Sequence, residues 1–198
     1  MALDTTTVVR EALQLLRSDG LQAVTFRNLT TRLGVAAPAI YWRFASKQEL
    51  LEAMAEQMLR EQFGELRPPT DNQAWRTWLS DTLHTLRRAM LAYPDGARII
   101  TGSRPLQTPT LGVLPEYALA TTDLEPTEAA TIVYTALHFT FGHVIEEQES
   151  TLSRQMDAET AARFAANLPT VMRTIATARR AGVSPDDVYD ACLARIIG

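Results

Sequence analysis

Cysteine and lysine are almost absent from this sequence of 198 residues, which contains one of each, Cys192 and Lys47. A single cysteine excludes an internal disulfide and any metal centre that needs several cysteine ligands. Long apolar runs are also missing, since no stretch approaches the roughly 20 residues that cross a membrane. The first residues lack the charged-then-apolar pattern of a secretory signal. These absences predict a cytoplasmic protein with no membrane partner.

The residue patterns of enzyme active sites are missing as well. The sequence shows no nucleophile–base set, no glycine-rich phosphate loop and no spacing typical of metal ligands. The three histidines are His84, His138 and His143, and the last two lie five residues apart on one predicted helix, a poor spacing for a metal pair. We expect hydrogen-bonded packing roles for them, in a protein that is not an enzyme and uses neither a metal nor a cofactor.

Charge is unevenly distributed along the chain, although the net charge is only −4. Residues 1–48 carry a net charge of +3, so the remainder carries −7. The basic side chains of the first segment are Arg10, Arg17, Arg27, Arg32, Arg43 and Lys47. A basic segment attached to an acidic body favours a phosphate-facing module carried by a domain with another task.

Two short helical patterns meet at a glycine within residues 25–47. Leu29 and Leu33 are four residues apart, as are Ile40 and Phe44, so each pair forms an apolar face on its own helix. The pattern predicts two short amphipathic helices in close succession.

The residues between these two helices favour a tight corner. Gly34 follows the first helix, where a left-handed backbone costs glycine least, and Val35 is placed to fill the corner. Pro38 falls in the first turn of the second helix, where its missing N–H is harmless. This layout is typical of a helix-turn-helix, whose second helix enters the major groove of DNA.

The second helix of this motif presents small, aromatic and basic side chains outward. Its alanines allow close approach to thymine methyl groups, and Tyr41 and Lys47 are suited to bonding phosphates. Arg27, from the first helix, can reach a guanine edge or a phosphate. A compact three-helix unit with no DNA role is the alternative, but it leaves the exposed pair Tyr41 and Trp42 unexplained. Double-stranded DNA is therefore the expected partner.

Helical periodicity dominates the rest of the chain, and strand alternation is almost absent. The sequence predicts an all-α fold of nine or ten helices, with a three-helix N-terminal domain before a larger helical body. The expected helices span residues 5–18, 26–33, the second half of the motif, 47–64, 72–92, 97–101, 110–121, 126–147, a broken region at 158–181, and a final helix that ends at Ile197. Polar residues 148–157 are expected to form a loop, and the order of residues 150–181 is left open.

The run LTTRLGVAAPAIYWRFASKQELLEAM at residues 29–54 resembles the DNA-binding domain of the TetR family of bacterial repressors. The resemblance implies a DNA-binding domain at residues 1–48 and a ligand-binding and dimerisation domain at residues 49–198, connected by the helix at 47–64. The residues expected to contact DNA are Thr25, Arg27, Ala36, Ala37, Pro38, Ala39, Tyr41, Trp42 and Lys47. Tetracycline repressors hold polar base-reading residues where this chain has Ala37 and Ala39, so its operator should differ.

Two segments of the body, DGARIITGSRP at 95–105 and HFTFGHVIEEQE at 138–149, resemble the ligand and dimer domain of the tetracycline repressor subfamily. The resemblance implies a homodimer whose interface is a four-helix bundle, formed by the helix at 126–147 and the final helix of each subunit. Side-chain stripes fit this interface, although a buried core helix would produce the same stripes. The stripes comprise Ile132, Ala136 and Phe139 on one helix and Val188, Cys192, Arg195 and Ile196 on the other.

Departures from the subfamily bear on the ligand. In that subfamily tetracycline binds as a magnesium complex with one histidine as the direct protein ligand of the metal, and Ile100 matches that position here. Because magnesium takes oxygen and occasionally nitrogen ligands, the departure predicts a different, largely hydrophobic effector. The residues expected to line its cavity are Phe63, Thr82, Leu86, Ile100, Ser103, Arg104, Pro105, Val113, Glu116 and Glu146. A solid core in place of the cavity is the alternative.

These features predict a repressor that binds a palindromic operator as a homodimer and is released by a small-molecule effector. We expect the effector to shift the helix at 47–64 through Phe63 and the segment 95–105. A constitutive or activating DNA-binding regulator without an inducer is the alternative.

Overall fold

The computed structural model describes residues 3–70, 73–152 and 158–198. Within these ranges the protein contains eleven α-helices, one short 3-10 helix and no strand. In chain order the elements are α1 (Thr5–Asp19), η1 (Leu21–Ala23), α2 (Phe26–Leu33), α3 (Ala37–Tyr41), α4 (Lys47–Phe63), α5 (Trp75–Leu91), α6 (Gly96–Thr101), α7 (Pro109–Ala120), α8 (Pro126–Leu152), α9 (Ala158–Asn167), α10 (Pro169–Arg180) and α11 (Pro185–Ile197). None of these described helices is long and apolar enough to cross a membrane. The expected all-α fold is confirmed.

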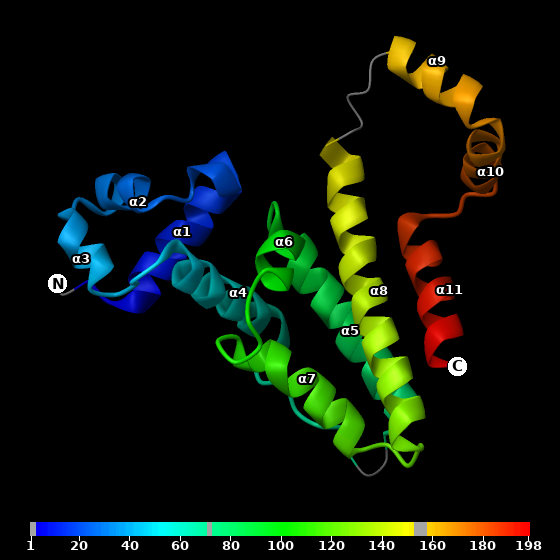
Figure 1. The fold of residues 1–198 in the computed structure, drawn as a ribbon, viewed down its shortest axis with the longest axis horizontal. Helices are drawn as coiled ribbons and strands as arrows, with labels where there is room; N and C mark the ends of the chain where they lie inside the picture. Colours follow the sequence, from blue (N-terminus) through cyan, green and yellow to red (C-terminus); the bar gives the residue numbers. More distant parts are fainter. Residues whose placement is uncertain (1–2, 71–72, 153–157) are drawn as a thin grey trace.

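Helices α1, α2 and α3 form an N-terminal head around a small apolar core (Figure 1). Ala12 and Leu16 of α1, Leu29 of α2 and Ile40 of α3 are all fully buried in it. Gly34 ends α2 with a φ of +64°, the left-handed conformation that glycine adopts without a steric penalty. The apolar residues and the glycine therefore build the predicted helix-turn-helix, although α3 ends at Tyr41 and the buried Phe44 lies beyond it and not on it.

Side-chain caps fix where the helices of this region begin. The Thr25 hydroxyl accepts a hydrogen bond from the backbone N–H of Asn28, 3.2 Å away, at the start of α2. The Ser46 hydroxyl accepts from the backbone N–H of Glu49 at 3.2 Å, and the Glu49 carboxylate accepts from the N–H of Ala45 at 2.8 Å. These bonds satisfy N–H groups that have no partner within their own helix.

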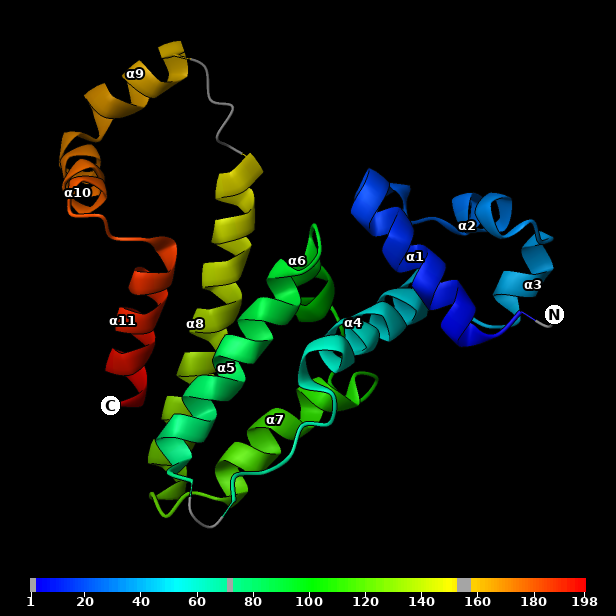
Figure 2. The same ribbon diagram turned by 180° about the vertical axis from the view of Figure 1, so that it is seen from behind.

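Helix α4 belongs to both parts of the molecule, because it packs against α1 of the head and against α5 of the body. Its residues Leu50, Met54 and Met58 are fully buried, as are Leu79 and Leu83 of α5. In Figures 1 and 2, α5 lies between α4 and α8, and α11 lies along α8. One continuous apolar core therefore extends from the head into the body.

Two expectations about the C-terminal half differ from the structure. Helix α8 continues to Leu152, so the loop predicted from residue 148 is wrong as far as residue 152, and residues 153–157 lie outside the described residues. The polar side chains at 147–149 have partners on other helices, which sequence periodicity does not reveal. The broken region at 158–181 forms two helices, α9 and α10, which bring the total to eleven rather than nine or ten.

Helices α9 and α10 stand away from the other helices (Figures 1 and 2). None of the residues of α10, all of which are described, is buried. Val171 and Ile175 of α10 leave their apolar side chains exposed, as does Leu168 just before it. This part of the chain therefore adds little to the core.

The side-chain amide of Gln148 joins α8 to α5 and α6. Its Nε2 donates to the carbonyl oxygens of Met90, at 3.1 Å, and Tyr93, at 2.9 Å, while its Oε1 accepts from the backbone N–H of Ala97 at 3.1 Å. These bonds satisfy groups at the end of α5 and the start of α6 that lack helical partners. Gly96 lies at the same joint, where an added Cβ would overlap the carbonyl oxygen of Met90.

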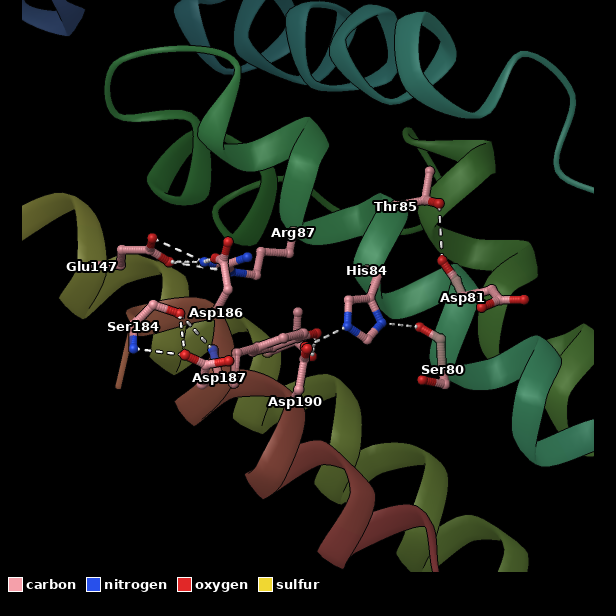
Figure 3. A network of polar contacts seen from close by, with 12 residues as sticks. Ser80, Asp81, His84, Thr85, Arg87, Glu147, Ser184, Asp186, Asp187 and Asp190 are labelled. Atoms are coloured by element: carbon pink, nitrogen blue, oxygen red, sulfur yellow. Dashed lines mark hydrogen bonds and ion pairs between the residues drawn. The ribbon is translucent and has the colours of Figure 1, made fainter. Parts of the chain in front are cut away.

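A buried arginine holds α11 against α5 and α8 (Figure 3). The Nη2 of Arg87 in α5, whose side chain is 10% exposed, donates to Glu147 of α8 at 2.9 and 3.0 Å and to Asp186 of α11 at 2.6 Å. Its guanidinium also lies 5.0 Å from the ring centroid of Tyr189. Burial opposes the charge of Arg87, but the two carboxylates outweigh it and raise its pKa. Removing either carboxylate would leave the guanidinium with one carboxylate partner and would cost a charge-assisted hydrogen bond.

Tyr189 and His143 form an aromatic centre between α11 and α8. Tyr189 is fully buried, its hydroxyl lies 2.9 Å from Oγ1 of Thr140, and burial raises its pKa to about 12. The ring of His143 lies 5.3 Å from that of Tyr189 and 5.4 Å from that of Phe139, centroid to centroid. Its Nε2 is buried without a hydrogen-bond partner among the described residues, and burial lowers the pKa of His143.

The other two histidines lie in different surroundings. Nδ1 of His84 donates to the carbonyl oxygen of Ser80 at 2.8 Å, and its Nε2 lies 2.8 Å from the carboxylate of Asp190 (Figure 3). His138 is exposed, with its ring 6.2 Å from that of Tyr134. Across the described part of the chain, histidine, cysteine and acidic residues form no group that could hold a metal ion.

Replacing Gly96 with alanine should destabilise the protein by roughly 1–3 kcal/mol, because the added methyl group overpacks the joint of α5, α6 and α8. Gly142→Ala is the matched control, since a Cβ there would meet no described atom within 4 Å and should stabilise α8 by up to about 1 kcal/mol. Urea unfolding followed by circular dichroism at one fixed protein concentration measures both. Equal midpoints for the two variants would contradict the close contact at Gly96.

Acid should destabilise the protein partly through His143. Because its folded-state pKa lies below the unfolded value of 6.5, the unfolded chain takes up a proton first, and the unfolding free energy falls as the pH drops below 6.5. His143→Phe keeps an aromatic ring in the stack and should reduce this loss, whereas His138→Phe at an exposed position should not. Denaturant unfolding between about pH 7 and about pH 5 measures the difference. The same pH dependence in the wild-type protein and His143→Phe would refute this role.

Candidate functional site

The short helix α3 presents two aromatic side chains to solvent. Trp42 is 86% exposed and Tyr41 is 57% exposed. Ile40 of α3, in contrast, is fully buried in the head core. The ring of Phe26 packs edge-on against Tyr41 with centroids 5.0 Å apart, which fixes the direction of the tyrosine. The exposed aromatic pair therefore lies on a helix that is held in place from beneath.

Most residues expected to contact DNA lie on the surface of this end of the molecule. The exposed members are Arg27, Ala36, Ala37, Pro38, Tyr41, Trp42 and Lys47. Thr25 and Ala39 are half-buried, and the hydroxyl of Thr25 caps α2. Arg32 pairs with Glu11 of α1, so its charge is partly compensated within the head. Exposed Arg43 adds a basic side chain between Trp42 and Lys47.

The residues expected to line a ligand cavity occupy different environments. Thr82, Leu86, Ile100 and Ser103 are buried, Phe63 and Val113 are half-buried, and Arg104, Pro105, Glu116 and Glu146 are exposed. Leu86 and Ile100 belong to the continuous apolar core. Of the buried members, Thr82, Leu86 and Ile100 lie on the adjoining helices α5 and α6, and Ser103 follows the end of α6. Glu116 and Glu146 lie on the outside.

The stripes expected at a dimer interface point partly inward. Ala136 of α8 is fully buried within this chain, and Ile132 and Phe139 are half-buried. On α11, Val188 and Arg195 are exposed, whereas Cys192 and Ile196 are half-buried. The α8 stripe thus contributes to the body core, while much of the α11 stripe is accessible to a partner.

A buried carboxylate on α4 binds an arginine beyond the end of α6. Glu52 is 3% exposed, and its two oxygens accept from Nε of Arg104 at 2.7 Å and from its Nη2 at 3.2 Å. The hydrogen bonds from Arg104 and Gln48 hold the pKa of Glu52 below its usual value, although burial acts in the opposite direction. This carboxylate is therefore held ionised between the head-connected helix and the body.

Gln48, Glu52 and Glu56 form a row at four-residue spacing on α4, which we call the polar ladder. Nε2 of Gln48 donates to the carbonyl oxygen of Gly102 at 3.0 Å. The carboxylate of Glu56 accepts from the backbone N–H of Thr110 at 3.1 Å and from its hydroxyl at 2.9 Å. The polar ladder thus holds the start of the segment between α6 and α7, at Gly102 and Arg104, and the first turn of α7, at Thr110.

Sequence reasoning did not identify the polar ladder. Arg104 was expected to bind a ligand, but in the structure its guanidinium is paired with Glu52. The four-residue spacing of Gln48, Glu52 and Glu56 was the available signal, because it places three polar groups on one face of a helix that also has an apolar stripe. Their partners lie about fifty residues away in the chain, and only the fold brings them close.

Both parts of the chain match known families. Residues 8–54 match the family described as bacterial regulatory proteins, tetR family. Residues 68–198 match the family described as tetracyclin repressor-like, C-terminal domain. The two matches lie on either side of the end of α4, which connects head and body.

Curated relatives include tetracycline repressors. The class A protein from transposon 1721 of Escherichia coli is 40% identical over 148 residues, which cover 74% of this chain and 68% of the relative. The class C protein of Escherichia coli is 34% identical over 204 residues, which cover 96% of this chain and 87% of the relative. The similarity to class C thus extends over nearly the whole chain.

Solved structures with the same fold include TetR from Acinetobacter baumannii AYE, which is 31% identical and has a TM-score of 0.73 over 98% of this chain and 95% of that one. A variant of that protein in complex with minocycline is 32% identical, with a TM-score of 0.78 over 98% and 92% of the two chains. BioQ with its natural double-stranded DNA operator is 29% identical, with a TM-score of 0.66 over 84% and 95%.

The helix-turn-helix head, the larger helical body and these matches agree along the chain. The curated relatives belong to the same family, and they are 40% and 34% identical over 74% and 96% of this chain. The protein belongs to the tetR family of bacterial regulatory proteins and is a transcription regulator with a helix-turn-helix DNA-binding domain and a ligand-binding domain.

Proposed function

We propose that the protein is a repressor that binds a palindromic operator as a homodimer and is released by a small, largely hydrophobic effector other than magnesium-tetracycline. The observation that carries this proposal is the polar ladder, which ties α4, the helix leaving the DNA-binding head, to the segment between α6 and α7. The proposed DNA-contacting surface lies at one end of α4, and the buried residues of the body adjoin its other side.

At the DNA end, α3 is the proposed recognition helix. The exposed Ala37 allows close approach to the major groove, while Tyr41 and Lys47 reach phosphates on its edge. The operator complex of BioQ supports this use of the fold by a relative. We assign residues 1–48 to DNA binding and residues 49–198 to effector binding and dimerisation, with α4 connecting the two.

At the effector end, the proposed site adjoins α5 and α6. Ile100 and Leu86 offer hydrocarbon, and Thr82, one turn before Leu86 on α5, is a buried polar residue. Isoleucine has no donor atom for magnesium, so the residues present do not fit a metal-bound tetracycline. Minocycline binds the variant of the Acinetobacter protein, which supports drug-sized ligands as a class for this fold.

Dimerisation would use α8 and α11 of each subunit. Val188 on α11 and Tyr134 on α8 are exposed apolar side chains, which supports this assignment. Two heads held by one dimer core would reach two half-sites at a fixed spacing, as a palindromic operator requires.

Release follows if the effector binds best to a conformation in which the heads no longer match that spacing. An effector near α6 would move the segment between α6 and α7, and the polar ladder would transmit this movement to α4. Phe63, half-buried at the last turn of α4, provides a second contact with the body core. The coupling is reciprocal, so operator DNA must weaken effector binding by the same factor.

Lys47→Ala should weaken operator binding and make it less dependent on salt. Loss of one phosphate contact should reduce the slope of log K against log salt concentration by about 1. Fluorescence anisotropy with an operator fragment selected from random-sequence duplexes measures the slope. Arg179→Ala, which removes an exposed charge on α10, is the control and should not change it. An unchanged slope in Lys47→Ala would exclude the phosphate contact.

Glu52→Gln should uncouple the effector from the operator, because it breaks the charged contact between α4 and Arg104. A compound found by screening for operator release should need a concentration about tenfold higher to release this variant, within the usual range of coupling energies. Glu65→Gln is the control, since Glu65 is exposed and pairs with Arg67 outside the polar ladder. Equal release midpoints for Glu52→Gln and the wild-type protein would rule out the polar ladder as the relay. A screen that finds no releasing compound would favour the constitutive alternative.

A further inference from the structure

A crevice of about 410 Å³ opens where the end of α5, the turn before α6 and the last turns of α8 meet. Its volume lies at the small end of the range for ligand pockets, roughly 300–1,000 Å³. None of the residues expected to bind the effector lines it. The crevice is therefore a separate cavity from the proposed effector site.

The frame of the crevice is rigid. The Gln148 amide, one of its lining groups, is fixed by three hydrogen bonds to the backbone of α5, α6 and the turn between them. Gly96 beside it allows the two backbones to approach closely. A cavity on such a joint is formed before a ligand arrives, which lowers the cost of binding.

The walls of the crevice combine hydrocarbon with an excess of negative charge. Leu91, Pro94 and Ile145 supply apolar surface. Three carboxylates, those of Asp95, Glu147 and Glu149, line the crevice together with a single guanidinium, that of Arg98.

Two of these carboxylates have to share one positive charge among the described residues. Arg98 is shared between Asp95, at 3.8 Å, and Glu149. Glu147 binds Arg87 behind the wall, and Arg87 also binds Asp186. In the part of the chain that the structure describes, the lining carboxylates of Asp95 and Glu149 thus share one guanidinium group, so this part of the crevice favours a cation over an anion.

One lining residue connects the crevice to the head. Tyr93 is 2% exposed, and its hydroxyl donates to Glu61 of α4 at 2.6 Å. The guanidinium of Arg17, on α1 of the head, lies 4.2 Å from the centroid of the Tyr93 ring. A ligand that displaces or fixes Tyr93 would therefore act on a direct contact between the body and α1.

We propose that this crevice is a second small-molecule site, which takes a small apolar molecule carrying a protonated amine and changes operator affinity through Tyr93. The apolar part lies against Leu91, Pro94 and Ile145, and the ammonium group lies near Asp95 and Glu149. The effect on operator affinity rests on the proposed DNA-binding function. It does not depend on which effector the first site binds.

Binding is tested by isothermal titration calorimetry with three probes of similar size, 2-phenylethylamine, 2-phenylethanol and 3-phenylpropanoate, at low salt. The wild-type protein should bind the amine about fivefold more tightly than the alcohol, as expected for a partly exposed ion pair, and the carboxylate least. Asp95→Asn should remove most of the preference for the amine, since asparagine also tolerates the positive φ of 55° at this position. Equal affinity for all three probes, or no binding of the amine, would overturn the proposal.

A filled-crevice variant locates the binding. Ala92→Trp adds a large side chain at an exposed lining position and should abolish binding of 2-phenylethylamine. Ala120→Trp adds the same side chain at the exposed end of α7 and is the matched control, which should bind the amine like the wild-type protein. Unchanged affinity in Ala92→Trp would place the amine elsewhere and overturn the assignment.

The connection to the head is tested with operator affinity at saturating 2-phenylethylamine. The amine should change operator affinity in the wild-type protein and have a smaller effect in Tyr93→Phe, which loses the hydrogen bond to Glu61 but keeps an aromatic ring at this lining position. Calorimetry on Tyr93→Phe checks that the amine still binds. An operator affinity that is insensitive to the bound amine in the wild-type protein would overturn this part of the proposal. If a screened effector still releases the operator, that negative result would not count against the proposed effector site.

Discussion

Helix α4 has to bury apolar side chains against two different partners, and the rest of the structure depends on that constraint. Leu50, Met54 and Met58 are fully buried on a helix that packs both on α1 and on α5. Because the same helix completes the core of the head and that of the body, neither part can move without changing the packing of the other. A helix with this double role is suited to transmitting a change between an effector and DNA.

Polar groups in the core then determine which packing is adopted. Glu52 and Arg87 are charges at sites of low exposure. Burying them costs desolvation energy unless their partners are in place, which are Arg104 for Glu52 and the carboxylates of Glu147 and Asp186 for Arg87. An apolar contact tolerates sliding, whereas these pairs require one geometry. They connect α4 to the segment after α6, and α5 to α8 and α11.

Local patterns predicted the head better than the body. The cap at Thr25 and the glycine at position 34 define α2 by interactions within a few residues, and its predicted bounds agree with the structure. The loop expected from residue 148 failed because Gln148 and Glu149 bind α5, α6 and Arg98, which are remote in sequence. For the site, the sequence indicated the exposed α3 surface, but it did not indicate the polar ladder or the crevice at Tyr93.

The sequence by itself determined an all-helical chain with a helix-turn-helix, because apolar periodicity, caps and a glycine act over one or two helical turns. Its membership of the TetR family was implied by the resemblance of residues 29–54 to that family, and the family matches confirm it. The sequence also determined that position 100 offers no metal ligand, since that depends on residue chemistry. Only the tertiary structure decided that Ala136 faces the core and that Arg104 pairs with Glu52. Such contacts join residues dozens of positions apart, and their geometry depends on how all the helices pack together.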